Sequence, residues 1–417
     1  MRDPGGPKHA AGRPRQNDYP TRQVAAGWPR QDDYSTRQVT ENGQSVGAWG
    51  EPTYQPRAPK PGNAKIGLSG NGRRWLWLIV GFIAVSMIAV LLVVVNNKPG
   101  ATISAGDSKA HCIVLQFPHG IMSQSEISAA SDLTGTTYNC VETFANGSPT
   151  WADWETPWMF STPSDGWDSW LAASPAHQVV LSIDLIPQSV ANSKNPLSWE
   201  QPCATGGYDQ YATALARNLM SYGAGNVVIR LGAEANGNWE DDYVGSTGAE
   251  MADWAKCFDN EVTAMRSVSG THFLFVWNPN ACTSNLPLSK WYPGDAYVDI
   301  VGIDAYDEDC STNKTASQEG WAAFSTNHAD NTVNDLDFPS IANMEAFSET
   351  HGKPMSFPEW GLYEGKPDDA SYVDDMGQMF TSKDFSFEGY YDSDDRGVVP
   401  LGSKIPSATT AYSQAFK

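Results

Sequence analysis

Hydrophobic residues after position 110 come in eight short runs, and longer stretches of mixed polarity separate the runs. The runs are nearly continuous and rich in β-branched residues, which is typical of strands buried on both faces of a parallel sheet. They lie at 112–117, 137–143, 178–186, 226–231, 272–277, 297–304, 354–359 and 385–391. The stretches between them include helix-like segments at 208–222, 248–267 and 340–350.

Strands that alternate with helices predict an α/β fold. Eight such units within residues 111–417 predict a closed (β/α)8 TIM barrel, a fold that usually takes about 250 residues plus insertions. An open, doubly wound sheet is the alternative, and it would carry a glycine-rich phosphate-binding turn after its first strand. The residues there read QFPHGIM and contain no GxGxxG motif, which favours the barrel.

One uninterrupted apolar stretch precedes this domain. Residues 75–95 carry no charge, and a helix of that length, at about 1.5 Å per residue, crosses a hydrocarbon core of about 30 Å. Arg73 and Arg74 precede the stretch, so the positive-inside rule places the N-terminus in the cytoplasm and the barrel outside. A cleaved signal peptide is the alternative, but it usually has a short basic leader. We therefore expect a single-pass plasma-membrane protein with an uncleaved transmembrane helix.

The segments on either side of the apolar stretch have a different composition. Residues 1–74 are rich in Pro, Gly, Gln and Arg and predict a disordered cytoplasmic tail, whereas residues 96–110 predict a short extracellular stalk. The tail contains a repeat, RQNDYPTRQV at 15–24 and RQDDYSTRQV at 30–39. Two interpretations stay open for the repeat: a docking site for an unidentified cytoplasmic partner, or a duplication without function.

Charge is distributed unevenly along the chain. Residues 1–74 contain 12 Lys+Arg and 6 Asp+Glu, a net charge of +6; the whole chain carries −21, so the remainder carries −27. An acidic domain repels nucleic acid and anionic lipid, and neither is an expected partner of it. A neutral polysaccharide is compatible with this field. The 16 tryptophans offer flat faces for sugar rings.

Five tryptophans gather between the second and third runs. They either form an aromatic rim for a polymer or pack the core of an insertion, and the sequence does not separate these interpretations. They are Trp151, Trp154, Trp158, Trp167 and Trp170.

All six cysteines follow the apolar stretch, the distribution expected of disulfides in an oxidising exterior. None has CxxC spacing, so we expect no metal site. The pair Asp241–Asp242 lacks a full calcium-binding loop and is better explained as solvated surface charge. The expected disulfides are Cys203–Cys257, Cys282–Cys310 and Cys112–Cys140.

Two glutamates stand where a barrel of this kind places its chemistry, at the carboxyl ends of strands. Glu234 follows the fourth run and Glu359 ends the seventh. The period of two along a strand places Arg230 and Glu234 on one face, pointing into the barrel, from where Arg230 can bond an inward carboxylate. Pro358 restricts the backbone immediately before Glu359.

A pair of carboxylates across the barrel mouth is the machinery of a glycosidase, which needs one protonated acid and one ionised carboxylate. Like charges held near each other push their pKa values apart, which supplies that division. The chemistry requires no cofactor. Trp277 and Asn278, which end the fifth run, and Trp360, which follows Glu359, are further candidates for contact with a polysaccharide substrate.

Three motifs resemble clan A glycoside hydrolases and, within them, family 26, the β-mannanase family. The motifs are RLGAEANGNW at 230–239, VGIDAY at 301–306 and PMSFPEWG at 354–361, and the order of elements matches over 111–417. The resemblance implies a retaining double displacement, with Glu234 as general acid/base and Glu359 as nucleophile. It further implies that Arg230 and Trp239 correspond to the family's arginine and subsite tryptophan. By the same resemblance, Tyr306 hydrogen-bonds the nucleophile and keeps it ionised.

The chain departs from the family at Ala233, where family 26 mannanases usually carry a histidine that organises the sugar beside the scissile bond. The departure leaves the substrate open between β-mannan, mixed-linkage glucan and xylan. The leading hypothesis is a membrane-anchored, extracellular, retaining endo-glycoside hydrolase acting on a β-linked polysaccharide. The alternatives are a non-catalytic glycan receptor on the same barrel, and a sensor whose signalling part is the cytoplasmic tail.

Overall fold

The computed structural model describes residues 109–114, 124–161, 167–191, 199–281, 286–307, 339–364, 368–393 and 397–417. The expected tail, the apolar stretch at 75–95, most of the stalk and the expected pair Cys282–Cys310 lie outside these ranges. Within the ranges, no helix has both the length and the apolar character that crossing a membrane requires.

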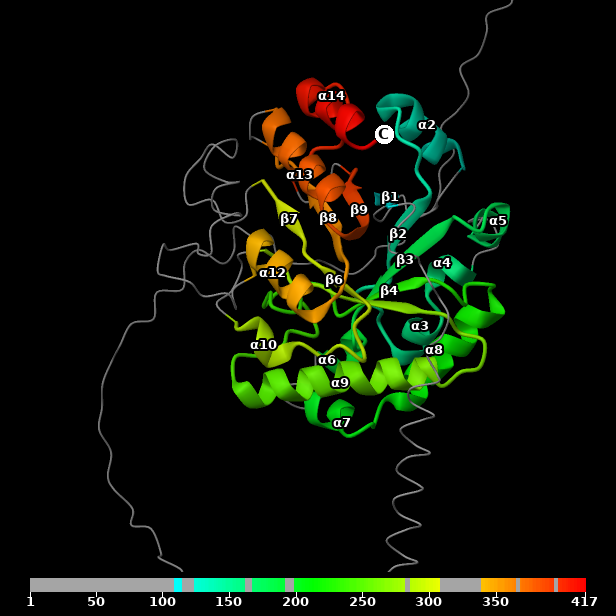
Figure 1. Ribbon diagram of the computed structural model, residues 1–417. Coiled ribbons are helices and arrows are strands. Elements are labelled where there is room, and N and C mark those ends of the chain that lie inside the picture. The colour runs from blue at the N-terminus through cyan, green and yellow to red at the C-terminus, as the bar shows by residue number, and fades with distance from the viewer. Residues whose placement is uncertain are drawn as a thin grey trace, which may run out of the picture. The chain divides into compact units, whose positions relative to one another are not determined.

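The strands form one parallel sheet that closes on itself (Figure 1). Strands that follow each other in the chain are paired, except β6 and β7, which both pair with β8; β1 also pairs with β9, so the ring has no free edge. The strands are β1 Ala110–Val114, β2 Cys140–Phe144, β3 Gln178–Ile183, β4 Val228–Leu231, β5 Leu274–Trp277, β6 Ile300–Gly302, β7 Ala305–Tyr306, β8 Met355–Gly361 and β9 Phe385–Tyr391. The predicted barrel is confirmed, with each strand inside or close to one of the eight predicted runs.

The sixth position of the ring differs from the single strand predicted at 297–304. It is shared by β6 and β7, because both pair with β8 while the chain between them turns inward at Asp304. β8, with which both β6 and β7 pair, has β9 as its other neighbour, and it shifts its register against β9 between Phe357 and Trp360. Pro358, which has no N–H to donate, lies at this irregularity.

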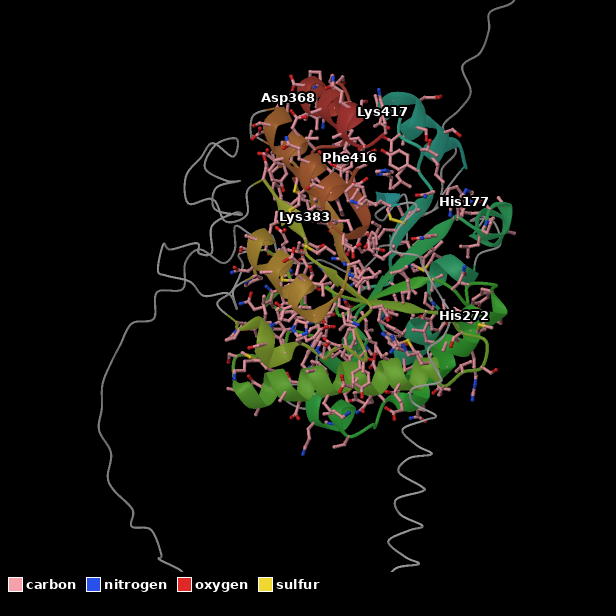
Figure 2. All side chains as sticks on the ribbon, in the orientation of Figure 1. His177, His272, Asp368, Lys383, Phe416 and Lys417 are labelled. Atoms are coloured by element: carbon pink, nitrogen blue, oxygen red, sulfur yellow. A yellow bond between two sulfur atoms is a disulfide. The ribbon has the colours of Figure 1, made fainter. Side chains whose placement is uncertain are left out.

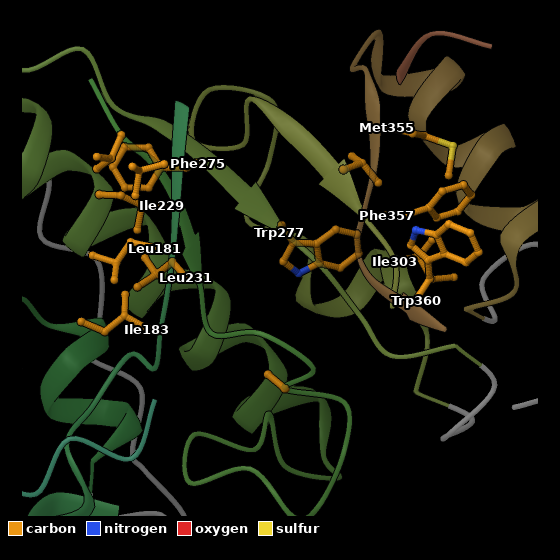
Figure 3. Close-up of a cluster of buried hydrophobic side chains, with 14 of the residues drawn as sticks. Leu181, Ile183, Ile229, Leu231, Phe275, Trp277, Ile303, Met355, Phe357 and Trp360 are labelled. Atoms are coloured by element: carbon orange, nitrogen blue, oxygen red, sulfur yellow. The ribbon is translucent and has the colours of Figure 1, made fainter. Parts of the chain in front are cut away.

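Side chains alternate between the inside of the ring and the helical layer around it. One small cluster draws a residue from each of seven strands, and such residues meet only inside the ring: Ala110, Cys112, Cys140, Val180, Val228, Val276, Ile300 and Phe387. Their neighbours point outward into the main core, where Leu181, Ile229, Phe275, Trp277 and Trp360 are buried (Figure 3). The inward register continues toward the carboxyl ends of the strands, where the cluster gives way to polar residues.

Helices cover the outside of the ring (Figure 1). The predicted segments at 208–222, 248–267 and 340–350 correspond to α8 Asp209–Ser221, α9 Gly248–Arg266 and α12 Ile341–His351. The α9 helix begins with a capping box, in which Thr247 and Glu250 satisfy each other's backbone N–H groups. The remaining helices are α2 Gln124–Thr134, α3 Trp151–Glu155, α4 Trp158–Ser161, α5 Trp167–Ala173, α6 Gln188–Ala191, α7 Glu200–Ala204, α10 Leu288–Trp291, α13 Ala370–Ser382 and α14 Pro406–Ala415.

Two disulfides are present among the described residues, and both are pairs that the sequence analysis expected. Cys112–Cys140 joins partners in register on β1 and β2. Cys203–Cys257 joins α7 to α9 in the outer layer.

Candidate active site

Arg230 is the centre of a polar network at the carboxyl ends of the strands. It lies two residues after Val228 on β4 and so points into the ring, where its side chain is fully buried. Its guanidinium donates to Asn278 Oδ1 at 2.7 Å and to Glu142 Oε1 at 3.0 Å, and it also pairs with Glu359 and Asp304. Burial opposes the charge, but the three carboxylates outweigh it and raise the pKa of Arg230. One permanent cation thus holds together the ends of β2, β4, β8 and the sixth position.

Glu359, on β8, receives hydrogen bonds on both carboxylate oxygens. The Tyr306 hydroxyl donates to Oε2 at 3.0 Å, and Arg230 Nη1 donates to Oε1. Its own backbone N–H donates to Asp304 Oδ1 at 3.0 Å, which fixes the direction in which the side chain leaves the strand. Two donors aimed at the two oxygens stabilise the negative charge that a nucleophilic carboxylate carries.

Glu234 reaches the same network by a different route from the one predicted. The strand ends at Leu231, Gly232 has a φ of 62° and Glu234 has a φ of 53°, so the period of two does not extend to it. Glu234 is the one non-glycine residue with a left-handed backbone among the described residues. Its N–H donates to Asn278 O at 3.0 Å, which holds the turn against the end of β5. Backbone strain of this kind is concentrated at functional sites.

Two donors position the Glu234 carboxylate. Asn280 Nδ2 donates to Oε1 at 2.8 Å, and Trp239 Nε1 donates to Oε2 at 3.2 Å. Burial raises the pKa of Glu234, and the nearby charge of Glu359 raises it further. Glu234 therefore keeps its proton to higher pH than an ordinary glutamate, as a general acid requires.

A third glutamate, Glu142 on β2, lies beneath the pair. Burial raises the pKa of Glu142 to about 8, although the nearby Arg230 charge lowers it. Its Oε2 atom has no hydrogen-bond partner, whereas Oε1 accepts from Arg230. A neutral Glu142 leaves the charge of Arg230 to Asp304 and Glu359.

The structure changes the roles expected of several residues. Arg230 and Asn278 are both 0% exposed, so they position the carboxylates and are not available to a substrate. Trp277 points outward because it directly follows the inward Val276, and Trp360 points outward beyond the register shift of β8. Trp277 packs on Trp291, and Trp360 donates its indole N–H to Glu388 at 2.8 Å. Both tryptophans were wrongly expected to contact substrate, since full burial in the outer layer removes them from the mouth.

The tryptophan group between β2 and β3 is mainly structural. Trp154 is fully buried, Trp151 stacks on Tyr211 at 4.0 Å, and Trp170 stacks on His177 at 3.6 Å, on the periphery of the molecule (Figure 2). Trp158 is 37% exposed. The side chain of Trp167 lies outside the described residues. By contrast, Trp239 is 37% exposed beside Glu234 and offers a ring face at the mouth.

Comparison with known proteins supports the class that this site defines, a (β/α)8 barrel with paired carboxylates. The resemblance to family 26 is confirmed, because the model of glycosyl hydrolase family 26 matches residues 197–336, which include Arg230, Glu234 and Tyr306. No curated protein sequence matches the chain.

Solved structures share the fold. A modular endo-β-1,4-mannanase from Cellulomonas fimi superposes with a TM-score of 0.50 at 16% identity, over 74% of this chain and 70% of that one. A mannanase from Bacillus subtilis gives a TM-score of 0.49 at 16% identity, over 74% of this chain and 85% of that one. Together, the family match and the fold support a glycoside hydrolase.

Proposed function

We propose that the protein is a retaining endo-glycoside hydrolase of β-linked polysaccharide, with Glu359 as nucleophile and Glu234 as general acid/base. The observation that carries the proposal is the different environment of the two carboxylates. Glu359 accepts from Arg230 and Tyr306, whereas Glu234 is half-buried beside a like charge. The two donors that bond its carboxylate, Asn280 and Trp239, are neutral. This asymmetry assigns one group to attack and the other to proton transfer.

The reaction then has two steps. Glu359 attacks the anomeric carbon while Glu234 donates its proton to the leaving glycosidic oxygen, which forms a glycosyl-enzyme ester and releases the first product. Glu234, now ionised, takes a proton from water, and the water oxygen displaces Glu359 from the sugar. For retention, we expect the two carboxyl groups to stand about 5–5.5 Å apart. Asn280 and Trp239 hold Glu234 in place through both steps.

The proposed substrate class rests on the match to glycosyl hydrolase family 26 and on the residues at the open end of the barrel. The Cellulomonas fimi structure compared above is an endo-β-1,4-mannanase, and Trp239 offers a ring on which one sugar can stack beside the bond to be cut. Ala233 is 5% exposed and carries no group that could hydrogen-bond a sugar. We therefore propose a β-mannan or a related β-glycan, with less selection by residue 233 than a histidine would give.

The place of action is a separate proposal. The apolar residues 75–95 anchor the chain in the plasma membrane, with residues 1–74 in the cytoplasm and the barrel outside. Two disulfides in the described residues fit an oxidising exterior. Protease treatment of intact cells tests this arrangement: the barrel should be digested and a tag before residue 75 should be protected.

The catalytic proposal is tested with the full-length chain in detergent. We expect reducing ends to appear from β-mannan, mixed-linkage glucan or xylan, with a product whose anomeric configuration at first release matches the substrate by proton NMR. Glu359→Gln should lower kcat by about 10³-fold or more, and Glu388→Gln, a buried glutamate of the outer layer, is the matched control. Binding of glycan without any release of reducing ends would instead identify a glycan receptor, and an inverted product would overturn the double displacement.

A further inference from the structure

Three acidic side chains outside the catalytic network meet where the loops after β3 and β4 come together. One oxygen atom from each of Asp184, Glu240 and Asp242 lies within 4.8 Å of the others. Asp184 is 1% exposed and Asp242 is 0% exposed. The expectation that Asp242 belongs to solvated surface charge is therefore wrong, because the loop folds its side chain inward against Leu185.

The two aspartates of this group receive no charge compensation from the side chains that the structure describes. Among the described residues, no ion pair includes Asp184 or Asp242. Their hydrogen bonds come from neutral donors: Asn146 Nδ2 and Gly147 N for Asp184, and Leu185 N at 2.9 Å for Asp242. Asp242 Oδ1 is buried and has no partner at all. Two buried carboxylates and one orphaned oxygen are costly unless a cation or a shared proton compensates them.

The backbone of both aspartates is held rigidly. The indole N–H of Trp154 donates to Asp184 O at 2.7 Å, and that of Trp254 donates to Asp242 O at 2.8 Å. Both tryptophans are fully buried. Two large anchors that fix the carbonyls of the acidic residues keep the carboxylates close together despite their repulsion, which is the preorganisation that an ion site needs.

We propose that Asp184, Glu240 and Asp242 bind a calcium ion. The donor atoms are all oxygens, which selects a hard cation over zinc or copper. Calcium–oxygen distances are about 2.4 Å, so ligands on opposite sides of the ion stand about 4.8 Å apart, and the three oxygens fall within that span. Calcium tolerates an irregular shell completed by water, whereas magnesium demands a near-ideal octahedron.

The ion acts on the loop that carries the catalytic acid. Glu240 directly follows Trp239, and Val244 N donates to Ala235 O at 2.8 Å, which closes residues 235–244 into one compact turn. A calcium ion that ties Glu240 and Asp242 to Asp184 fixes this turn to the β3 end of the barrel. It thereby fixes the position of the Trp239 ring beside Glu234.

The full-length chain in detergent, stripped of metal with a chelating resin, provides the test. We expect 1 mM CaCl₂ to raise Tm by about 5 °C, the shift for a ligand present at about 100 times its Kd. Metal analysis after dialysis should find one calcium per chain. Asp242→Asn and Asp184→Asn should each lose most of the Tm increment, while Asp374→Asn, the same charge change on the exposed face of α13, should keep it.

The measurement on the unmodified chain decides the proposal even if a variant fails to fold. A Tm that calcium does not change, together with no calcium in the metal analysis, overturns it and leaves a shared proton between Asp184 and Asp242 as the compensation. Stabilisation by MgCl₂ but not by CaCl₂ also overturns it.

Discussion

Asn280, in the segment after β5, donates its side-chain amide to Glu234 Oε1 at 2.8 Å. The same residue donates its backbone N–H to Asn236 Oδ1 at 2.8 Å and accepts from Asn236 Nδ2 at 2.9 Å. Asn280 therefore joins two loops and orients the carboxylate between them. The left-handed turn at Glu234 is stable because this neighbouring segment holds it from outside.

Asn280→Ala should move the alkaline limb of the pH profile of kcat/KM to higher pH. Burial and Glu359 raise the pKa of Glu234, and the hydrogen bond from the Asn280 side chain partly offsets that rise. Loss of this hydrogen bond therefore raises the pKa of Glu234 further. Activity requires protonated Glu234 and is lost as pH rises through its pKa, so the limb follows. We also expect kcat to fall about tenfold from lost orientation. Asn218→Ala is the control: it removes a hydrogen bond from a side-chain amide to Glu155 O in the outer layer, and it should leave the alkaline limb unchanged.

Tyr306→Phe should lower kcat by about 10- to 100-fold, because a hydrogen bond to a charged group is worth about 1.5–3 kcal/mol. The change removes the donor at 3.0 Å from Glu359 Oε2 and keeps the ring. Tyr292→Phe is the matched control, since its hydroxyl donates to Asp295, far from the mouth. Steady-state kinetics on the best polysaccharide decides the matter, and equal effects of the two variants would contradict the role given to Tyr306.

Gly237→Ala should lower kcat/KM and leave the free energy of unfolding nearly unchanged. A Cβ atom at position 237 would lie 2.4 Å from the Trp239 ring, so the indole must move away from Glu234. We expect kcat/KM to fall at least about tenfold, the equivalent of one lost hydrogen bond and one stacking face. Gly248→Ala, at a position where a Cβ meets nothing within 4 Å, is the control. An unchanged kcat/KM would show that the Trp239 ring does not contact the glycan.

The free energy of unfolding should fall as pH rises from about 5 to 8, and Glu142 should contribute to that fall. Its pKa is about 8 in the folded chain against an ordinary value of 4.5, so the folded state binds the proton more tightly. Between these values the unfolded chain has already released the proton, and stability declines by up to about 1.4 kcal/mol per pH unit. Glu142→Gln cannot titrate, and denaturant unfolding at several pH values should show a shallower decline. If the free energy of unfolding fell equally with pH in the unmodified chain and in Glu142→Gln, Glu142 would not contribute to the decline.

The fold was predictable from the sequence to a large extent. Strands buried on both sides leave nearly continuous apolar runs, and the run that forms Gln178–Ile183 is a typical example. The break between β6 and β7 was not predictable, since no glycine or proline pair marks the turn at Ile303–Asp304, where Asp304 pairs with Arg230. A tertiary ion pair of this kind leaves no periodic signal.

The site was predictable where motifs or strand ends mark it, at Glu234, Glu359, Tyr306 and Trp239. It was missed where the contact depends on two loops, as at Asn280, or on depth in the barrel, as at Glu142 and Asp304. The sequence places these last two on inward positions, and reading inward parity along all eight runs would have found them. The same parity assigns Trp277 to the outer layer, whereas Trp360 lies there only because β8 shifts its register before it.

The pairing of β1 with β9 imposes an order on biogenesis. Ala110–Val114 meets its partner strand at Phe387–Tyr391, almost at the other terminus of the domain, so the ring cannot close until nearly the whole chain has left the ribosome. Until then β1 is secured on one side only, through the Cys112–Cys140 link to β2. A nascent chain that stalls before residue 385 therefore presents an open sheet edge, which chaperones can bind and quality-control proteases can attack.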